Sequence, residues 1–201
     1  MLLHYLFIGG LILMAYLIGS LSSAILISKS MHLPDPRTSG SHNAGATNVL
    51  RLGGKKAAIL TLAGDILKGA IPILLGRACG LSEEVLAYLA IAAFLGHLFP
   101  VFFAFKGGKG VAIALGSILV LSWQLALMVF AIWLLVTLVF RYVSLSSLCA
   151  AVSMPFLTYF FIDRHLLIPI TIISVIIVLK HRDNIIRLLK GTEPRIDQRS
   201  E

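Results

Sequence analysis

A polar, glycine-rich segment at residues 40–48 has the clearest potential for chemistry in this sequence. It reads Gly-Ser-His-Asn-Ala-Gly-Ala-Thr-Asn and lies in a chain that is otherwise mostly apolar. Glycine permits positive φ angles and lets peptide N–H groups approach a ligand closely, while hydroxyl and amide side chains add neutral hydrogen-bonding groups. Such groups suit the binding of phosphate oxygens. The alternative interpretation of the segment is a flexible loop whose polarity has no function. The candidate ligands are Gly40, Ser41, Asn43, Gly45, Thr47 and Asn48.

Arg51 follows this segment and adds a planar cationic group. If a helix begins near Val49, the guanidinium lies beside the positive end of that helix, a second favourable place for an anion. Loops longer than about 12 to 15 residues are usually functional or disordered, and this one is not of low complexity. We therefore favour a phosphate-handling site.

A second glycine-rich segment, Lys106-Gly107-Gly108-Lys109-Gly110, predicts another anion site. Glycines around Lys109 free the backbone to wrap an anion, and the helix expected to follow adds its positive end. The segment does not satisfy the Walker A pattern, so ATP is not implied. Gly107, Gly108, Lys109 and Gly110 are candidate ligands, whereas Lys106 is equally well explained as a marker of membrane topology.

Three ionisable residues lie within apolar segments. Asp65 and Lys68 are three residues apart, so on a helix they share a face and can pair, either to hold helices together or to serve a substrate. His97, with Pro100 close behind it, is more simply explained as the end of a helix than as a chemical group. These three stay uncertain as site residues.

The carboxyl-terminal region carries a fourth polar motif, His181-Arg182-Asp183-Asn184, followed by Arg187 and Glu193. If the last apolar helix continues, Lys180, Asn184, Arg187 and Gly191 share one face. A basic tail that binds anionic lipid is the alternative, but it does not explain His181 and Asn184. Ser147 adds a hydroxyl at the same level, although membrane helices also use serine for packing.

The composition indicates that these motifs belong to an integral membrane protein with a single domain, residues 1–201. The 201 residues are 58% apolar and 13% charged, with a mean hydropathy of +0.95, far outside the range of soluble proteins. The net charge of +8 comes largely from short loops beside apolar runs, so no nucleic-acid partner is implied. Cys79 and Cys149 have no metal-binding or redox spacing, and no metal site is expected.

The apolar runs predict an all-α bundle of seven transmembrane helices. They cover residues 2–27, 57–76, 85–105, 111–140, 143–162 and 166–179. The 30 residues of the fourth run exceed the roughly 20 that one crossing needs, so we expect a break at Ser122-Trp123-Gln124. We expect the first run to be kept as a membrane helix, since it lacks the basic start of a secretory signal.

The distribution of Lys and Arg favours an outside N-terminus and a cytoplasmic C-terminus. With seven helices, the basic loops all face the cytoplasm, and the four polar motifs meet at one surface of the membrane. These loops are residues 29–56, 106–110, 141–147 and 180–201. A six-helix arrangement would put Arg141 and the basic tail on the opposite side from the first basic loop.

The motifs resemble those of the bacterial acyl-phosphate-dependent glycerol-3-phosphate acyltransferases, the PlsY family. The resemblance runs through the chain in order, and Ala44, where members usually carry proline, is a departure that implies a slightly softer loop. The matching segments are Asp35-Pro36-Arg37, Gly40 to Arg51, Gly64-Asp65-x-x-Lys68-Gly69, Gly96-His97-x-x-Pro100, Lys106 to Ala112, and His181-Arg182-x-Asn184-Ile185-x-Arg187.

The resemblance implies that a fatty acyl group passes from acyl phosphate to the 1-hydroxyl of sn-glycerol 3-phosphate, giving lysophosphatidic acid and phosphate. It also implies a multi-pass protein of the bacterial inner membrane with a cytoplasmic active site and no cofactor. The enzyme that makes acyl phosphate is a candidate partner, beside membrane lipid. The residues carried over as catalytic or substrate-binding are Ser41, Arg51, Lys109, His181 and Asn184, with residues 107–110 near glycerol 3-phosphate.

Two functions from other classes compete with this one. A transporter of phosphorylated metabolites also needs cations in a membrane, but transporters usually place them near the midplane on broken helices. An inert lipid-binding scaffold would explain the basic tail but not the glycine loops. If the protein is such an enzyme, the base that takes the hydroxyl proton is either a substrate phosphate, which the resemblance to the family implies, or His181.

Overall fold

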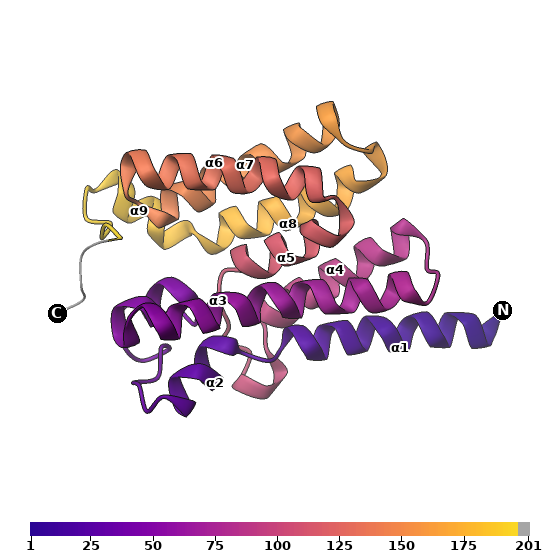
Figure 1. Cartoon of the computed structure of the whole chain (residues 1–201), viewed down its shortest axis with the longest axis horizontal. Coiled ribbons are helices and arrows are strands. Elements are labelled where there is room, and N and C mark those ends of the chain that lie inside the picture. The colour runs from indigo at the N-terminus through magenta and orange to yellow at the C-terminus, as the bar shows by residue number, and fades with distance from the viewer. Residues whose placement is uncertain (197–201) are drawn as a thin grey trace. The chain divides into compact units, whose positions relative to one another are not determined.

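The computed structural model of this chain describes residues 1–196, and all regular structure in that range is helical (Figure 1). The predicted all-α class is therefore confirmed for these residues. The chain forms two compact units, Met1–Leu121 and Ser122–Glu201. Arg199, which belongs to the basic tail, lies outside the described residues.

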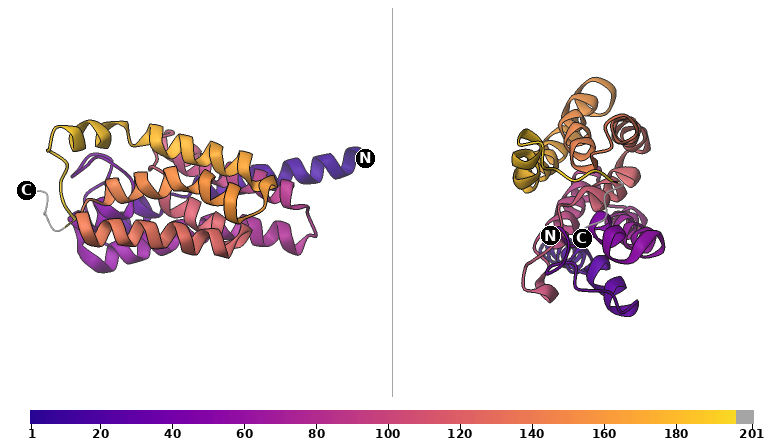
Figure 2. Two further views of the ribbon diagram at one scale, coloured as in Figure 1. Left: turned by 90° about the horizontal axis from the view of Figure 1, so that it is seen from above. Right: turned by 90° about the vertical axis from the view of Figure 1, so that its left-hand side faces the viewer.

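The first unit contains five α-helices and one short 3-10 helix within the described residues. They are α1 (Leu2–Gly19), α2 (Ser23–Ser30), α3 (Ala46–Ala78), α4 (Glu83–Leu98), η1 (Val101–Phe103) and α5 (Val111–Leu121). The second unit contains α6 (Trp123–Phe140), α7 (Val143–Phe161), η2 (Arg164–Leu166), α8 (Leu167–Lys180) and α9 (Arg182–Leu189). In this unit α7 contacts α6, α8 and α9 (Figure 2).

The first apolar run, residues 2–27, was expected to be one membrane helix but is divided into two helices, of which Leu2–Gly19 is long and apolar enough to cross a membrane. The first helix ends at Gly19 and α2 begins at Ser23. The hydroxyl of Ser20 donates to the Tyr16 carbonyl at 2.9 Å, and the Ser22 hydroxyl accepts from the Ile25 N–H at 3.5 Å. Serine side chains thus satisfy backbone groups at both helix ends, and this makes the break tolerable in an apolar setting.

The break predicted at Ser122 is confirmed. The fifth helix ends at Leu121 and the sixth begins at Trp123, with the Ser122 hydroxyl accepting a hydrogen bond from the Leu125 N–H at 3.3 Å. Serine is a favoured N-cap residue because its oxygen satisfies an N–H group of the first turn.

Five helices within residues 1–196 are long and apolar enough to cross a membrane, or six if the bent pair α8–α9 counts as one span. The apolar α5 has only 11 residues, about 16 Å at 1.5 Å per residue, whereas the hydrocarbon core is about 30 Å thick. These helices identify a multi-pass membrane protein. The count of seven and the orientation of the termini stay predictions.

Small residues let two helix pairs of the first unit approach closely. A Cβ at Gly19 would overlap the Ala93 carbonyl oxygen, which joins α1 to α4, and a Cβ at Gly69 would overlap the Ile113 carbonyl oxygen, which joins α3 to α5. Membrane helices use such positions because close backbone contact maximises van der Waals packing. The second contact holds the start of α5 beside the part of α3 that contains Asp65 and Lys68.

Candidate functional site

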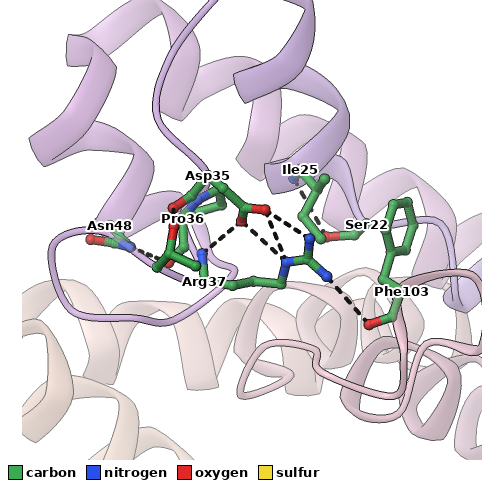
Figure 3. Close-up of polar contacts among 8 residues, drawn as sticks. Ser22, Ile25, Asp35, Pro36, Arg37, Asn48 and Phe103 are labelled. Carbon is green, nitrogen blue, oxygen red and sulfur yellow. Dashed lines mark hydrogen bonds and ion pairs between the residues drawn. The ribbon is translucent and has the colours of Figure 1, made fainter.

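The side chain of Asn48 organises the backbone of the first glycine-rich loop. It is 1% exposed, and its Nδ2 lies 2.8 Å from the Pro36 carbonyl oxygen (Figure 3), 2.9 Å from that of Ser39 and 3.1 Å from that of Asn43. Its Oδ1 accepts from the Ser41 N–H at 2.9 Å. The amide is therefore used to shape the loop, and a direct contact of Asn48 with a ligand stays a prediction.

Gly40 is required where it stands, because φ is +64° and a Cβ would overlap Asn48 Oδ1. The loop ends at Gly45, where α3 begins without a side-chain cap. The helix therefore starts at Ala46, three residues before the predicted start, and Thr47 lies in its first turn. Arg51 lies in the next turn of this helix, near its N-terminus, and is partly exposed.

An ion pair fastens the start of this loop to another segment of the same unit. Asp35 Oδ2 lies 2.7 Å from Arg37 Nη2, and Arg37 Nη1 donates to the Phe103 carbonyl oxygen at 3.5 Å (Figure 3). The hydrogen bond with Arg37 lowers the pKa of Asp35, despite partial burial that raises it. The sequence indicates only a turn at 35–37, and nothing local in it signals the contact with Phe103.

The second glycine-rich loop begins with two residues in the left-handed region, Ala104 at φ +54° and Phe105 at φ +58°. This conformation is uncommon for side-chain-bearing residues and turns the chain sharply after η1. Gly107 packs on the main chain of His97, since a Cβ there would overlap the His97 carbonyl oxygen. Lys109 is partly exposed, and α5 begins at Val111. The predicted order of loop, lysine and helix start is therefore present.

Gly108 connects the two loops. Its N–H donates to the His97 carbonyl oxygen at 3.3 Å. A Cβ at Gly108 would overlap His97 Nε2 and would lie 2.7 Å from the carbonyl oxygen of Ala44 in the first loop. Segments that are more than 50 residues apart in the sequence are thus in contact. The first unit holds three of the four polar motifs.

A buried ionic cluster lies beside these loops. Asp65 Oδ1 is 2.9 Å from Lys68 Nζ and 3.7 Å from His97 Nδ1. Lys68 Nζ also donates to the carbonyl oxygen of Leu21, at the break between α1 and α2, at 2.7 Å. The expected pairing of Asp65 with Lys68 is confirmed, as is the helix end near His97, since α4 ends at Leu98.

The fourth motif lies in the second unit and differs from its predicted form. The last helix does not continue, because α8 ends at Lys180 and the segment containing α9 is bent from it by 54°. Gly191 lies beyond α9, so the expected continuous polar face is wrong. His181 stands at the bend and is 3% exposed, and its Nδ1 lies 2.8 Å from the Ile177 carbonyl oxygen. A carbonyl accepts only, so Nδ1 carries the proton.

Glu193 holds the two remaining polar residues of this motif. Its Oε1 accepts from Asn184 Nδ2 at 2.6 Å and its Oε2 from Arg187 Nε at 2.7 Å. Burial works to raise the pKa of Glu193, but the hydrogen bonds from Asn184 and Arg187, with the charge of Arg187, outweigh it and lower the pKa. The carboxylate thus fixes the amide and the guanidinium beside the bend.

We expect Glu193→Gln to lower stability by about 2 kcal/mol at neutral pH, the usual range for hydrogen bonds to charged groups. The pKa of Glu193 is lowered in the folded protein, so its stabilisation is complete above the ordinary value of 4.5 and is lost as pH falls through the lowered pKa. The difference in thermal midpoint between wild type and variant in detergent should therefore shrink below that value. A difference that stays constant down to strongly acidic pH would contradict this assignment.

Ser147 lies on α7 in the same unit and is 4% exposed. Its hydroxyl donates to the Val143 carbonyl oxygen at 2.8 Å and accepts from Trp133 Nε1 at 3.3 Å. The side chain therefore joins α7 to α6. Its predicted contact with a substrate stays a prediction.

Comparison with known proteins gives a consistent result over nearly the whole chain. A family model described as glycerol-3-phosphate acyltransferase matches residues 9–191. The glycerol-3-phosphate acyltransferase of Methylococcus capsulatus is 51% identical over 187 residues, covering 92% of this chain and 94% of the relative. That of Coxiella burnetii is 48% identical over 185 residues, covering 92% and 96%.

Two solved structures are similar as well. The crystal structure of PlsY (YgiH), an integral membrane glycerol 3-phosphate acyltransferase, in its glycerol 3-phosphate form matches with a TM-score of 0.88 and 43% identity, over 94% of both chains. Its lysophosphatidic acid form matches with a TM-score of 0.85 and 42% identity, again over 94% of both chains. Identity at this level over this length reaches beyond a shared fold.

Proposed function

This chain belongs to the glycerol-3-phosphate acyltransferase family, and on that premise we propose that acyl phosphate is its acyl donor. The reaction transfers a fatty acyl group to the 1-hydroxyl of sn-glycerol 3-phosphate and gives lysophosphatidic acid and inorganic phosphate. It is the first acylation step of phospholipid synthesis. Both substrates carry a phosphate and one carries an apolar chain, and a membrane protein with two glycine loops suits them.

The observation that carries the proposal is the contact between the two loops of the first unit. Gly108 of the second loop packs against Ala44 of the first, and each loop leads directly into a helix, α3 or α5. Helix N-termini and the N–H groups of glycine loops favour anions. Arg51 and Lys109 add a cation to each loop. Two phosphates can therefore be held close together although they repel each other.

We assign residues 107–110 to the phosphate of glycerol 3-phosphate, with Lys109 neutralising its charge. Ser41 and Arg51 receive the acyl phosphate, with the first loop supplying neutral hydrogen-bonding groups. We also assign catalytic roles to His181 and Asn184 of the second unit, where Glu193 positions Asn184. The resemblance to the family supports these roles. They are also supported by the residue types, since cationic and hydrogen-bonding side chains suit phosphate groups.

The chemistry needs no protein nucleophile, because acyl phosphate is already an activated mixed anhydride. The C1 oxygen of glycerol 3-phosphate attacks the acyl carbonyl carbon, a new ester C–O bond forms, and the bond between acyl carbon and phosphate oxygen breaks. The hydroxyl proton passes to a substrate phosphate, and His181 through Nε2 is the second candidate base. Orientation of the two reactants can supply roughly 7 to 11 kcal/mol of the barrier reduction.

The arrangement in the membrane follows from the distribution of charge. All 201 residues form one acyltransferase domain with seven transmembrane helices, an outside N-terminus and a cytoplasmic C-terminus. The active site faces the cytoplasm of a bacterial cell at the inner membrane, where the enzyme that makes acyl phosphate could deliver its product. The long apolar chain of that product enters from the membrane.

Purified protein mixed with palmitoyl phosphate and glycerol 3-phosphate tests the proposal. We expect release of phosphate and formation of lysophosphatidic acid in equal amounts, and no lysophosphatidic acid when palmitoyl-CoA replaces palmitoyl phosphate. Equal use of palmitoyl-CoA would overturn the donor. Uptake of glycerol 3-phosphate into proteoliposomes without lysophosphatidic acid formation would instead favour a transporter.

A further inference from the structure

We propose that His97, which lies beside Asp65, is a positioning residue that sets the place of the Gly107–Gly110 loop and thereby the affinity for glycerol 3-phosphate. This inference rests on the proposed function, which assigns that loop to the glycerol 3-phosphate phosphate. His97 itself need not touch the substrate. It acts through the backbone of Gly108.

The imidazole ring of His97 lies between a carboxylate and the glycine loop. On one side, Nδ1 is 3.7 Å from Asp65 Oδ1. On the other side, Nε2 occupies the place where a Cβ of Gly108 would be. The main chain of His97 also contacts the loop, because its carbonyl oxygen accepts from the Gly108 N–H at 3.3 Å. The loop therefore rests on both the ring and the backbone of one residue.

The carboxylate beside the ring belongs to a chain of polar contacts that reaches the break between α1 and α2. Asp65 pairs with Lys68 at 2.9 Å, and Lys68 donates to the Leu21 carbonyl at 2.7 Å. The side chains of Asp65, Lys68 and His97 are 3%, 6% and 7% exposed. Charges at such depth are costly unless paired, and within a membrane segment they usually serve a function. The break at Leu21, helices α3 and α4, and the Gly107–Gly110 loop are thus joined through this cluster of three side chains.

Gly108 is the point at which this support acts on the site. The glycine faces His97 Nε2 and the Ala44 carbonyl oxygen, which belongs to the other loop. A shift of the imidazole would move the backbone that holds the phosphate, and a displacement of about 1 Å can cost about 10²-fold in activity. The ring therefore determines the place of the loop, and it is also a reason why position 108 must be glycine.

The test uses His97→Ala, His97→Asn, Gly108→Ala and the double variant His97→Ala with Gly108→Ala, all purified as full chains. We expect His97→Ala to raise the KM for glycerol 3-phosphate about 10-fold or more, with a much smaller change in kcat and in the KM for palmitoyl phosphate. His97→Asn keeps a polar group toward Asp65 and should recover part of the affinity.

The double variant separates positioning from a general loss of packing. In the wild-type background, the new Cβ of Gly108→Ala meets both the His97 ring and the Ala44 carbonyl oxygen, and in the His97→Ala background the first and closer of these obstacles is gone. The further loss caused by Gly108→Ala should therefore be several-fold smaller in the double variant, since the effects of mutations at contacting residues are not additive. Additive losses, or a His97→Ala effect confined to kcat, would overturn the inference.

Thr61→Val is the matched control, because Thr61 lies on α3 one turn before Asp65, is 0% exposed, and makes no hydrogen bond through Oγ1 within the described residues. It should leave both KM values unchanged. If His97→Ala fails to fold in detergent, Asp65→Asn and His97→Asn are compared in its place, and both should raise the KM for glycerol 3-phosphate.

Failure of the inference and failure of the proposed function give different results. If Gly108→Ala raises the KM for glycerol 3-phosphate but the His97 and Asp65 variants do not, the loop binds the substrate without this support. If Gly108→Ala leaves that KM unchanged, the assignment of the loop is wrong, and the inference is wrong with it.

Discussion

Arg51→Ala should reduce phosphate release from palmitoyl phosphate by about 10²- to 10³-fold, the usual loss when one preorganised charge or donor is removed from a transition state. The guanidinium lies in the second turn of α3, immediately after the first glycine loop. It carries a permanent charge and a planar set of donors that can hold two phosphate oxygens together. Under the proposed assignment, loss of that group leaves the acyl phosphate with the neutral donors of the loop.

Arg51 is partly exposed, so its removal should not unfold the protein. Arg51→Lys keeps the charge but loses the planar geometry, and we expect an intermediate rate. Lys55→Ala is the matched control, because this exposed cation lies four residues further along the same segment, beyond the non-helical Gly54. Wild-type-like release by Arg51→Ala, with the thermal midpoint unchanged, would refute the assignment of Arg51.

Lys109→Ala should cause a second large loss, about 10²-fold or more in kcat/KM for glycerol 3-phosphate. Lys109 lies within the glycine loop that precedes α5, where its ammonium adds to the field of backbone N–H groups and of the helix end. Under the proposed assignment, loss of this charge means that the phosphate of glycerol 3-phosphate approaches the acyl phosphate without neutralisation. The two anions then repel each other in a medium that screens charge poorly.

Lys106→Ala distinguishes a local role of Lys109 from a general effect of positive charge. Lys106 is exposed and lies three residues before Lys109, ahead of the glycines that contact His97. We expect its variant to retain most of the activity, with at most a small change that added salt abolishes. Equal losses in the two variants would indicate that the loop acts through its net charge alone, and the assignment of Lys109 as a ligand would fail.

Much of this architecture follows from local patterns. The membrane class follows from long apolar runs, and the break at Ser122 follows from a capping residue within a run too long for one crossing. The pairing of Asp65 with Lys68 follows from their separation of three residues on a helix. Each depends on residues close together in the chain, and for that reason spacing is enough to predict it.

Other features depend on contacts between distant segments, and spacing along the chain does not contain them. The bond from Lys68 to Leu21 joins residues 47 apart. The same is true of the packing of Gly108 on His97 and Ala44. Asn48 likewise donates hydrogen bonds to three backbone carbonyls of the preceding loop, and its spacing in the sequence does not indicate this. The 54° bend at His181 also depends on how the helices pack.

The physical reason for this division lies in the kinds of residue concerned. Apolar runs, glycines and capping serines have preferences that act over a few residues, and these determine which segments are helices and which can surround an anion. A buried amide, imidazole or ammonium must instead find a partner wherever the fold supplies one. Only the packed helices decide which carbonyl Lys68 meets and which glycine rests on His97.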